Sequence, residues 1–117
     1  MSEGVNIIDC IQTGIKAEGL RRKAIAGNIA NLETPGYRSI GVRFEQLLEE
    51  VIQGKAKLEE IEPELKQLNQ TPVKHNGNDV NLEAEIGKMI ENDLRHGVLV
   101  RVLRKKYEQM EQAISIQ

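Results

Sequence analysis

The stretch LEAEIGKMIENDLRHGVLVRVLRKKYEQMEQAI, residues 82–114, decides the fold. It contains a mainly apolar stripe that alternates steps of three and four residues, which is the period of one helix face: Ile86, Met89, Asp93, His96, Val100, Leu103, Tyr107, Met110 and Ile114. Asn81 is a candidate N-cap, and Glu83 and Glu85 in the first turn suit the helix dipole. The pattern predicts one helix about 45 Å long. A stripe of this length needs a partner to cover it.

A second long helix is predicted near the N-terminus. Its stripe reads as a heptad pattern with two charged interruptions: Ile8, Ile11, Ile15, Glu18, Arg22, Ile25, Ile29 and Leu32. Thr34-Pro35-Gly36 ends this helix, because proline disfavours helical geometry at the residue before it and Pro-Gly fits the centre of a type II turn. The stripe is coiled-coil-like, with a weak middle.

The middle of the chain gives a less regular pattern. Apolar spacing over residues 44–52 predicts one short amphipathic helix. Residues 58–68 stay open between helix and loop because Pro63 interrupts their apolar pattern, and residues 69–81 are polar and rich in turn formers. We therefore expect an all-α fold of three segments, which are a helix over 1–33, a turn with a short helix and a variable acidic part over 34–81, and a helix over 82–117.

Composition excludes several classes of protein. The chain has 117 residues, of which 39% are hydrophobic but only 3% aromatic, so a ligand pocket lined by large aromatic side chains is poorly supplied. The formal net charge of −2 offers no overall basic field for nucleic acid. No stretch approaches the roughly 20 apolar residues of a membrane span. The start, Met1-Ser2-Glu3-Gly4, has no basic segment followed by an apolar run, so we expect no cleaved signal peptide.

The sequence lacks the residue spacings that are typical of catalytic or metal-binding sites. Cys10 is the single cysteine, and His75 and His96 are far apart in the sequence, so no metal-ligand spacing is present. The sequence contains no glycine-rich phosphate loop and no convincing nucleophile–base pair. We expect neither an enzyme nor a bound cofactor or metal.

The end of the first helix carries a resemblance to a known family. The stretch Ala26-Gly27-Asn28-Ile29-Ala30-Asn31-Leu32-Glu33-Thr34-Pro35-Gly36-Tyr37-Arg38 resembles the N-terminal signature of the flagellar rod and hook family, roughly N-I-A-N-x-x-T-P-G-Y-[KR]. Every fixed element of that signature is present. In the family, it stands where a terminal helix ends.

A second stretch is similar to the C-terminal half of the proximal rod proteins of this family. It comprises Asn76-Gly77-Asn78-Asp79-Val80-Asn81-Leu82-Glu83, followed by Met89, Glu91-Asn92 and Leu94-Arg95. The family pattern is near D-G-N-x-V-D-L-D-x-E-M and then A-E-N-x-L-R-Y. The chain departs from it at Asn76, Asn81, Ile86, Ile90 and His96.

The resemblance implies a structural subunit of the proximal rod of the flagellar basal body. Such subunits are exported by the flagellar type III apparatus without a cleaved signal peptide, and their terminal helices form an inner tube around the export channel. The implied partners are other copies of the chain, other rod subunits, the rod adapter protein at the MS ring and the export gate, with no nucleic acid and no direct membrane span.

On this basis both terminal helices are expected to form the assembly interface. Its predicted residues are Ile8, Ile11, Ile15, Ile25, Asn28, Ile29, Asn31, Leu32, Ile86, Met89, Val100, Leu103, Tyr107, Met110 and Ile114. Thr34, Pro35, Gly36 and Tyr37 form a turn motif at the junction with the rest of the subunit.

Several alternatives stay open at this point. The two stripes fit an antiparallel hairpin within one chain as well as contacts between chains, and the resemblance favours contacts between chains. Asn28 and Asn31 either set the register between helices or only weaken a helix end. The acidic residues within 45–64 and the basic clusters at 21–23 and 101–106 are either ordinary solvated faces or complementary surfaces of stacked subunits. Rival functions are another proximal rod subunit and a soluble helical-hairpin adaptor.

Overall fold

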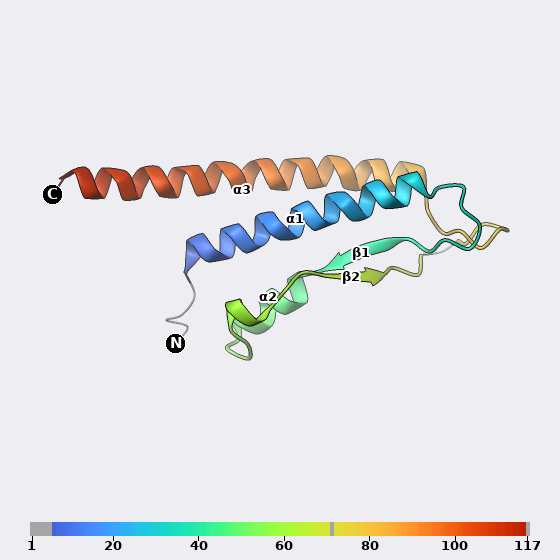
Figure 1. Cartoon of the computed structure of the whole chain (residues 1–117), viewed down its shortest axis with the longest axis horizontal. Helices are drawn as coiled ribbons and strands as arrows, with labels where there is room; N and C mark the ends of the chain where they lie inside the picture. The colour runs from blue at the N-terminus through green and yellow to red at the C-terminus, as the bar shows by residue number, and fades with distance from the viewer. Residues whose placement is uncertain (1–5, 71, 117) are drawn as a thin grey trace.

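The computed structural model describes residues 6–70 and 72–116. The elements follow in the order α1 (Ile7–Ala30), β1 (Ile40–Arg43), α2 (Glu45–Ile52), the short 3-10 helix η1 (Leu58–Glu60), β2 (Glu64–Gln67) and α3 (Leu82–Ile116). The helices α1 and α3 lie side by side and antiparallel, and the middle segment lies on the opposite side of α1 from α3 (Figure 1). The molecule is a slab that measures 66 × 29 × 15 Å.

Both long helices begin where polar side chains can cap them. The Asn6 side chain accepts a hydrogen bond from the amide of Ile8 at 2.8 Å, and the Asn81 side chain accepts one from the amide of Ala84 at 3.0 Å. Such bonds satisfy amides of the first turn that have no partner within the helix. The predicted N-cap at Asn81 is thus confirmed, and so is the long terminal helix that follows it.

The all-α prediction is wrong in the middle of the chain. There β1 and β2 form a two-stranded antiparallel sheet in which Ile40 lies opposite Gln67 and Arg43 lies opposite Glu64. The β-branched Ile40 and Val42 alternate along β1, as strand residues do, and Val42 is buried. Residues 58–68 are not a helix, because η1 stops before Pro63 and the chain then enters β2.

The apolar core lies between α1 and the middle segment. Its buried members are Ala17, Ala24, Val42, Phe44, Val51, Leu58 and Ile61. The alanines on α1 let its backbone lie close to β1, and the single phenylalanine of the chain, Phe44, is buried with them. No residue of α3 belongs to this cluster. The contact between α1 and α3 therefore has a different composition.

Candidate assembly interface

Buried polar side chains form the centre of the contact between α1 and α3. Asn92 of α3 donates to the backbone carbonyl of Glu18 at 2.7 Å and to its carboxylate at 3.0 Å, and both residues are buried. The Glu18 carboxylate also pairs with Arg21 on the next turn of α1, and Arg21 in turn pairs with Glu45 at the start of α2. Buried polar groups are stable only when they are hydrogen-bonded. The charged interruption in the first predicted stripe is therefore part of the packing between the two helices.

The side chain of Asn28 joins three elements at one point. Its amide nitrogen donates to the carbonyl of Ile40 and to the Glu85 carboxylate, both at 2.9 Å. Its amide oxygen accepts from the backbone of Ile40 at 2.9 Å and from the hydroxyl of Tyr37 at 2.8 Å. A primary amide has two donor hydrogens and two acceptor lone pairs, so all four are used. Asn28 and Glu85 thus set the register of α1, β1 and α3 within the chain.

The turn motif packs against the second motif of the sequence. Gly36 has φ of +74° and donates its amide to the carbonyl of Asn76 at 2.9 Å. The side chain of Asn78 donates to the carbonyls of Asn31 and Thr34 at 2.8 and 2.9 Å, which satisfies acceptors left over at the end of α1. The two stretches that carry the family resemblance therefore form one structural junction.

Asp79 anchors the other side of this junction. Its carboxylate accepts from the amides of Ser39 and Gln70 at 2.6 and 2.9 Å and pairs with Arg38 at 3.2 Å. Burial by itself would raise the pKa of Asp79, but these two amides and the charge of Arg38 outweigh it and hold the pKa below its ordinary value. The charged form of this carboxylate thus stabilises the folded junction.

The predicted interface residues are distributed over three environments. Ile11, Ile25 and Asn28 are buried within the fold of the single chain. A second group is half-buried: Ile8, Ile15, Ile29, Asn31, Leu32, Tyr37, Met89, Val100 and Leu103. The remaining residues are exposed: Thr34, Pro35, Gly36, Ile86, Tyr107, Met110 and Ile114. The structure thus has the antiparallel packing of the two helices within one chain that the sequence left as an alternative, and the exposed group has the most surface free for contact with another molecule.

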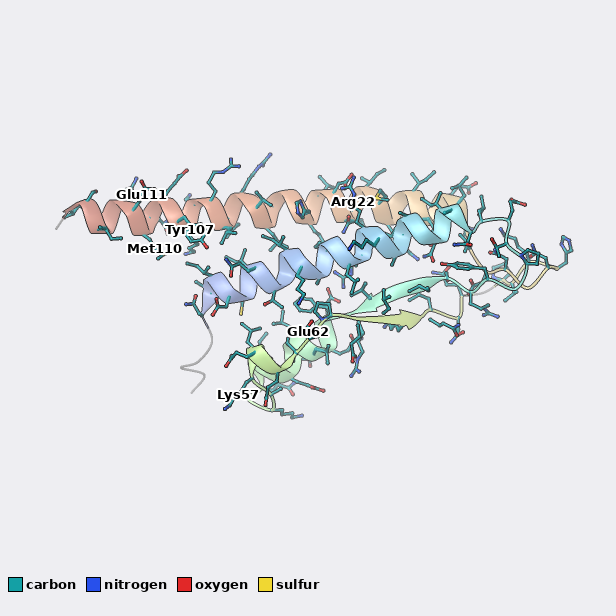
Figure 2. All side chains as sticks on the ribbon, viewed as in Figure 1. Arg22, Lys57, Glu62, Tyr107, Met110 and Glu111 are labelled. Atoms are coloured by element: carbon teal, nitrogen blue, oxygen red, sulfur yellow. The ribbon has the colours of Figure 1, made fainter. Side chains whose placement is uncertain are left out.

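The last turns of α3 extend past the first turn of α1. The hydroxyl of Tyr107 accepts a hydrogen bond from Gln12 at 3.1 Å, and every described residue from Tyr107 to Ile116 is exposed. Figure 2 shows Tyr107 and Met110 projecting from α3 on the side where α1 lies. Met110 is 48% exposed and Ile114 is 71% exposed. This part of α3, which we call the overhang (residues 108–116), carries apolar side chains that the described part of the chain does not cover.

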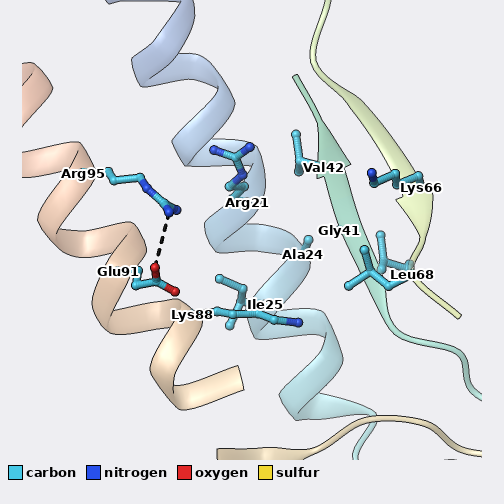
Figure 3. Close-up of a pocket in the computed structure, with 11 residues that line it drawn as sticks. Arg21, Ala24, Ile25, Gly41, Val42, Lys66, Leu68, Lys88, Glu91 and Arg95 are labelled. Atoms are coloured by element: carbon cyan, nitrogen blue, oxygen red, sulfur yellow. Dashed lines mark hydrogen bonds and ion pairs between the residues drawn. The ribbon is translucent and has the colours of Figure 1, made fainter. Parts of the chain in front are cut away.

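A cleft of about 230 Å³ lies between α1, the sheet and α3 (Figure 3). Apolar side chains, among them Ile25, Val42 and Leu68, form its floor. Its basic rim residues are mostly paired, because Lys88 bonds Glu85 at 3.1 Å and Arg95 bonds Glu91 at 3.4 Å. The lining contains no histidine, cysteine or serine that could act as a nucleophile or base.

The described ranges contain neither a metal-ligand cluster nor a helix that could span a membrane. Over residues 6–70 and 72–116, no three acidic, histidine or cysteine side chains come together as metal ligands would. Among the helices of that same part of the chain, none combines the length and apolarity that crossing a bilayer requires.

Sequence reasoning missed the residues that hold the junction and the helix pair. Glu18, Glu85 and Asn92 are buried polar residues, and a search for apolar periodicity passes over them. Asn78, Asp79 and Asn92 did lie in the second stretch that resembles the family, and that resemblance was the signal that they matter.

Comparison with known proteins gives one informative relative. The chain is 23% identical over 122 aligned residues to a protein of Bacillus subtilis (strain 168) named flagellar basal body rod protein FlgB, and the match covers 92% of each chain. No model of a protein family matches the chain. The similarity is low in identity but extends over nearly the whole of both proteins.

Proposed function

We propose that this chain is a structural subunit of the flagellar basal body rod, and more narrowly of the proximal rod. The observation that carries the proposal is the match to FlgB over 92% of both chains. The motifs of the sequence support it, because the Asn28–Tyr37 stretch and the Asn76–Asp79 stretch pack together as a single junction. A structural role also agrees with a surface that offers apolar helix faces.

In this proposal the subunits assemble through their terminal helices around the export channel. The overhang and the exposed residues of the predicted interface supply apolar surface for neighbouring subunits. The proposed neighbours are further copies, other rod subunits, the adapter protein at the MS ring and the export gate, and the chain reaches them by type III export without a cleaved signal peptide.

The test uses a flagellated host strain in which the gene that encodes this chain has been deleted. Complementation with the gene should restore swimming, and purified basal bodies should contain the protein. A deletion strain that swims normally, or basal bodies that lack the protein while the strain swims, would contradict the proposal. A different rod subunit would be present in basal bodies but would not be replaced by the FlgB of the host, whereas a soluble adaptor would be recovered only from the cytosol.

A further inference from the structure

One side of α3 carries a row of exposed apolar residues. They follow one another at intervals of four: Ile86, Ile90, Leu94, Val98 and Val102. Their exposed fractions are 46, 57, 66, 56 and 40% in that order. Exposure is therefore greatest at Leu94 and falls almost equally toward both ends. We call these five residues the outer row.

The outer row shares only Ile86 with the stripe that the sequence predicted. The residues of α3 that touch α1 include Glu85, Asn92 and Leu99, and Leu94 lies between them in sequence but on the other side of the helix. Residues at intervals of four form an inclined ridge on a helix, which packs into the equivalent groove of another helix when the axes cross at about 50°. Gly87 and Gly97 flank the row, and space around both is open. A second helix can thus approach closely on this face.

A row that is symmetric about its middle residue is suited to pairing with itself. In an antiparallel pair related by a two-fold axis at Leu94, Ile90 of one copy lies beside Val98 of the other, and Ile86 lies beside Val102. Every exposed apolar residue of the row then has an apolar neighbour. A two-fold contact of this kind uses the same patch on both subunits.

Charge selects the antiparallel direction over the parallel one. The row is followed by Arg101, Arg104 and Lys105, none of which forms an ion pair with another residue in the described ranges. Two parallel copies would bring these cations together, at a cost from like-charge repulsion. An antiparallel pair separates them and places each near the end of the partner helix that begins with Glu83. Antiparallel helix dipoles favour the same direction.

From these observations, we infer that two copies of this chain pair antiparallel through the outer row before they join any larger assembly. One crossing of two helices buries less than the roughly 1,200 Å² of a stable interface, so the dimer is weak and forms only at high concentration. The inference does not need the proposed function. If the chain is a rod subunit, the dimer has to open, because copies that point in opposite directions cannot share one directional assembly.

Crosslinking tests the direction of pairing. In a Cys10→Ala background, Ile90→Cys and Val98→Cys proteins of different tagged sizes are mixed and treated with a short bis-maleimide. The expected main product is the mixed 90–98 dimer, and Leu94→Cys alone should crosslink to itself. Products that join 90 to 90 and 98 to 98 would show parallel pairing and overturn the inference.

Sedimentation tests whether the chain dimerises and whether the outer row forms the dimer contact. The unmodified chain should shift from monomer to dimer as its concentration rises, and Leu94→Glu should abolish the shift while its helical content and melting temperature stay unchanged. Gln112→Glu, on the same side of α3 but beyond the row, is the matched control and should still dimerise. A chain that stays monomeric at every concentration, or a Leu94→Glu variant that dimerises normally, would overturn the inference. Recovery of the protein in basal bodies is a separate measurement, so the two proposals can fail independently.

Discussion

At the scale of single residues, the fold depends on amide and carboxylate groups whose hydrogen bonds are fully used. Asn28 is 0% exposed and serves both the N–H and the carbonyl of Ile40. Its partner Glu85 is equally buried and also bonds Lys88. These groups determine which segments pair, in addition to stabilising the fold. No apolar residue of similar size can supply the two donors and two acceptors of Asn28.

Replacing Asn28 with alanine should therefore lower stability more than replacing its neighbour in the same motif. Asn28→Ala leaves the polar groups of Ile40 and Glu85 without a partner, and we expect a loss of about 3 kcal/mol in the free energy of unfolding. Asn31→Ala removes bonds to Gly27 and Thr34 at a half-buried site, and we expect a loss of about 1 kcal/mol. Urea denaturation of both variants measures the difference. Equal losses would show that Asn28 is not the junction's main support.

Asp79 should make the stability of the protein sensitive to acid. Its folded pKa lies below the unfolded value of about 3.9, so its contribution is complete above about pH 4 and is lost as the pH falls through the folded pKa. Asp79→Asn should lose about 2 kcal/mol at pH 7 and show a flatter fall in stability below pH 4. The control is Glu33→Gln, an exposed carboxylate. Parallel pH profiles for Asp79→Asn and the unmodified chain would contradict this account.

At the scale of elements, the turn after α1 depends on two glycines that face each other. Gly36 and Gly77 both have positive φ, at +74° and +86°. A Cβ on Gly77 would lie 3.3 Å from the Cα of Gly36. The backbone hydrogen bond from Gly36 to Asn76 joins the turn after α1 to the segment before α3. It holds the start of α3 next to the end of α1.

Gly36→Val should therefore destabilise the junction, because a β-branched residue is strained at this φ, with a cost of about 2 kcal/mol. Gly19→Ala provides the contrast, since Gly19 lies in α1 with open space around it and alanine there should stabilise the helix by up to about 1 kcal/mol. Thermal unfolding compares the two. If Gly36→Val melted like the unmodified chain, the turn would be an ordinary helix end.

The elements also show how far the sequence could predict this structure. The long helices follow from apolar period and from Pro35-Gly36, and the short helix at 45–52 follows from the same period. The sheet could not be predicted, since each strand has only four residues and β2 is exposed throughout. Met89, Val100 and Leu103 of the predicted stripe are half-buried. Periodicity could not predict that the polar side chains of Glu85 and Asn92 are buried at the contact with α1.

At the scale of the whole molecule, the chain is too extended to be a self-contained globule. Its radius of gyration is 17.9 Å, whereas a compact domain of this length has about 13 Å. Part of the difference lies in α3, which continues beyond α1 as the overhang (Figure 1). The apolar side chains there contribute little to the fold of one chain and are suited to contacts with another molecule.

Charges placed on the apolar side of the overhang should therefore impair assembly and leave folding intact. We expect the double variant Met110→Asp/Ile114→Asp to unfold within about 0.5 kcal/mol of the unmodified chain, because both residues are exposed. In the gene-deletion host it should fail to restore swimming and should be missing from basal bodies, since a desolvated, unpaired charge at an interface costs several kcal/mol.

The matched control is Gln109→Asp/Ser115→Asp, which puts the same two charges on other sides of the same turns and meets the same unfavourable helix dipole. That control should still swim. Equal swimming of both double variants would show that the apolar side of the overhang is not an assembly surface, and equal failure would show that any added charge at this end is excluded.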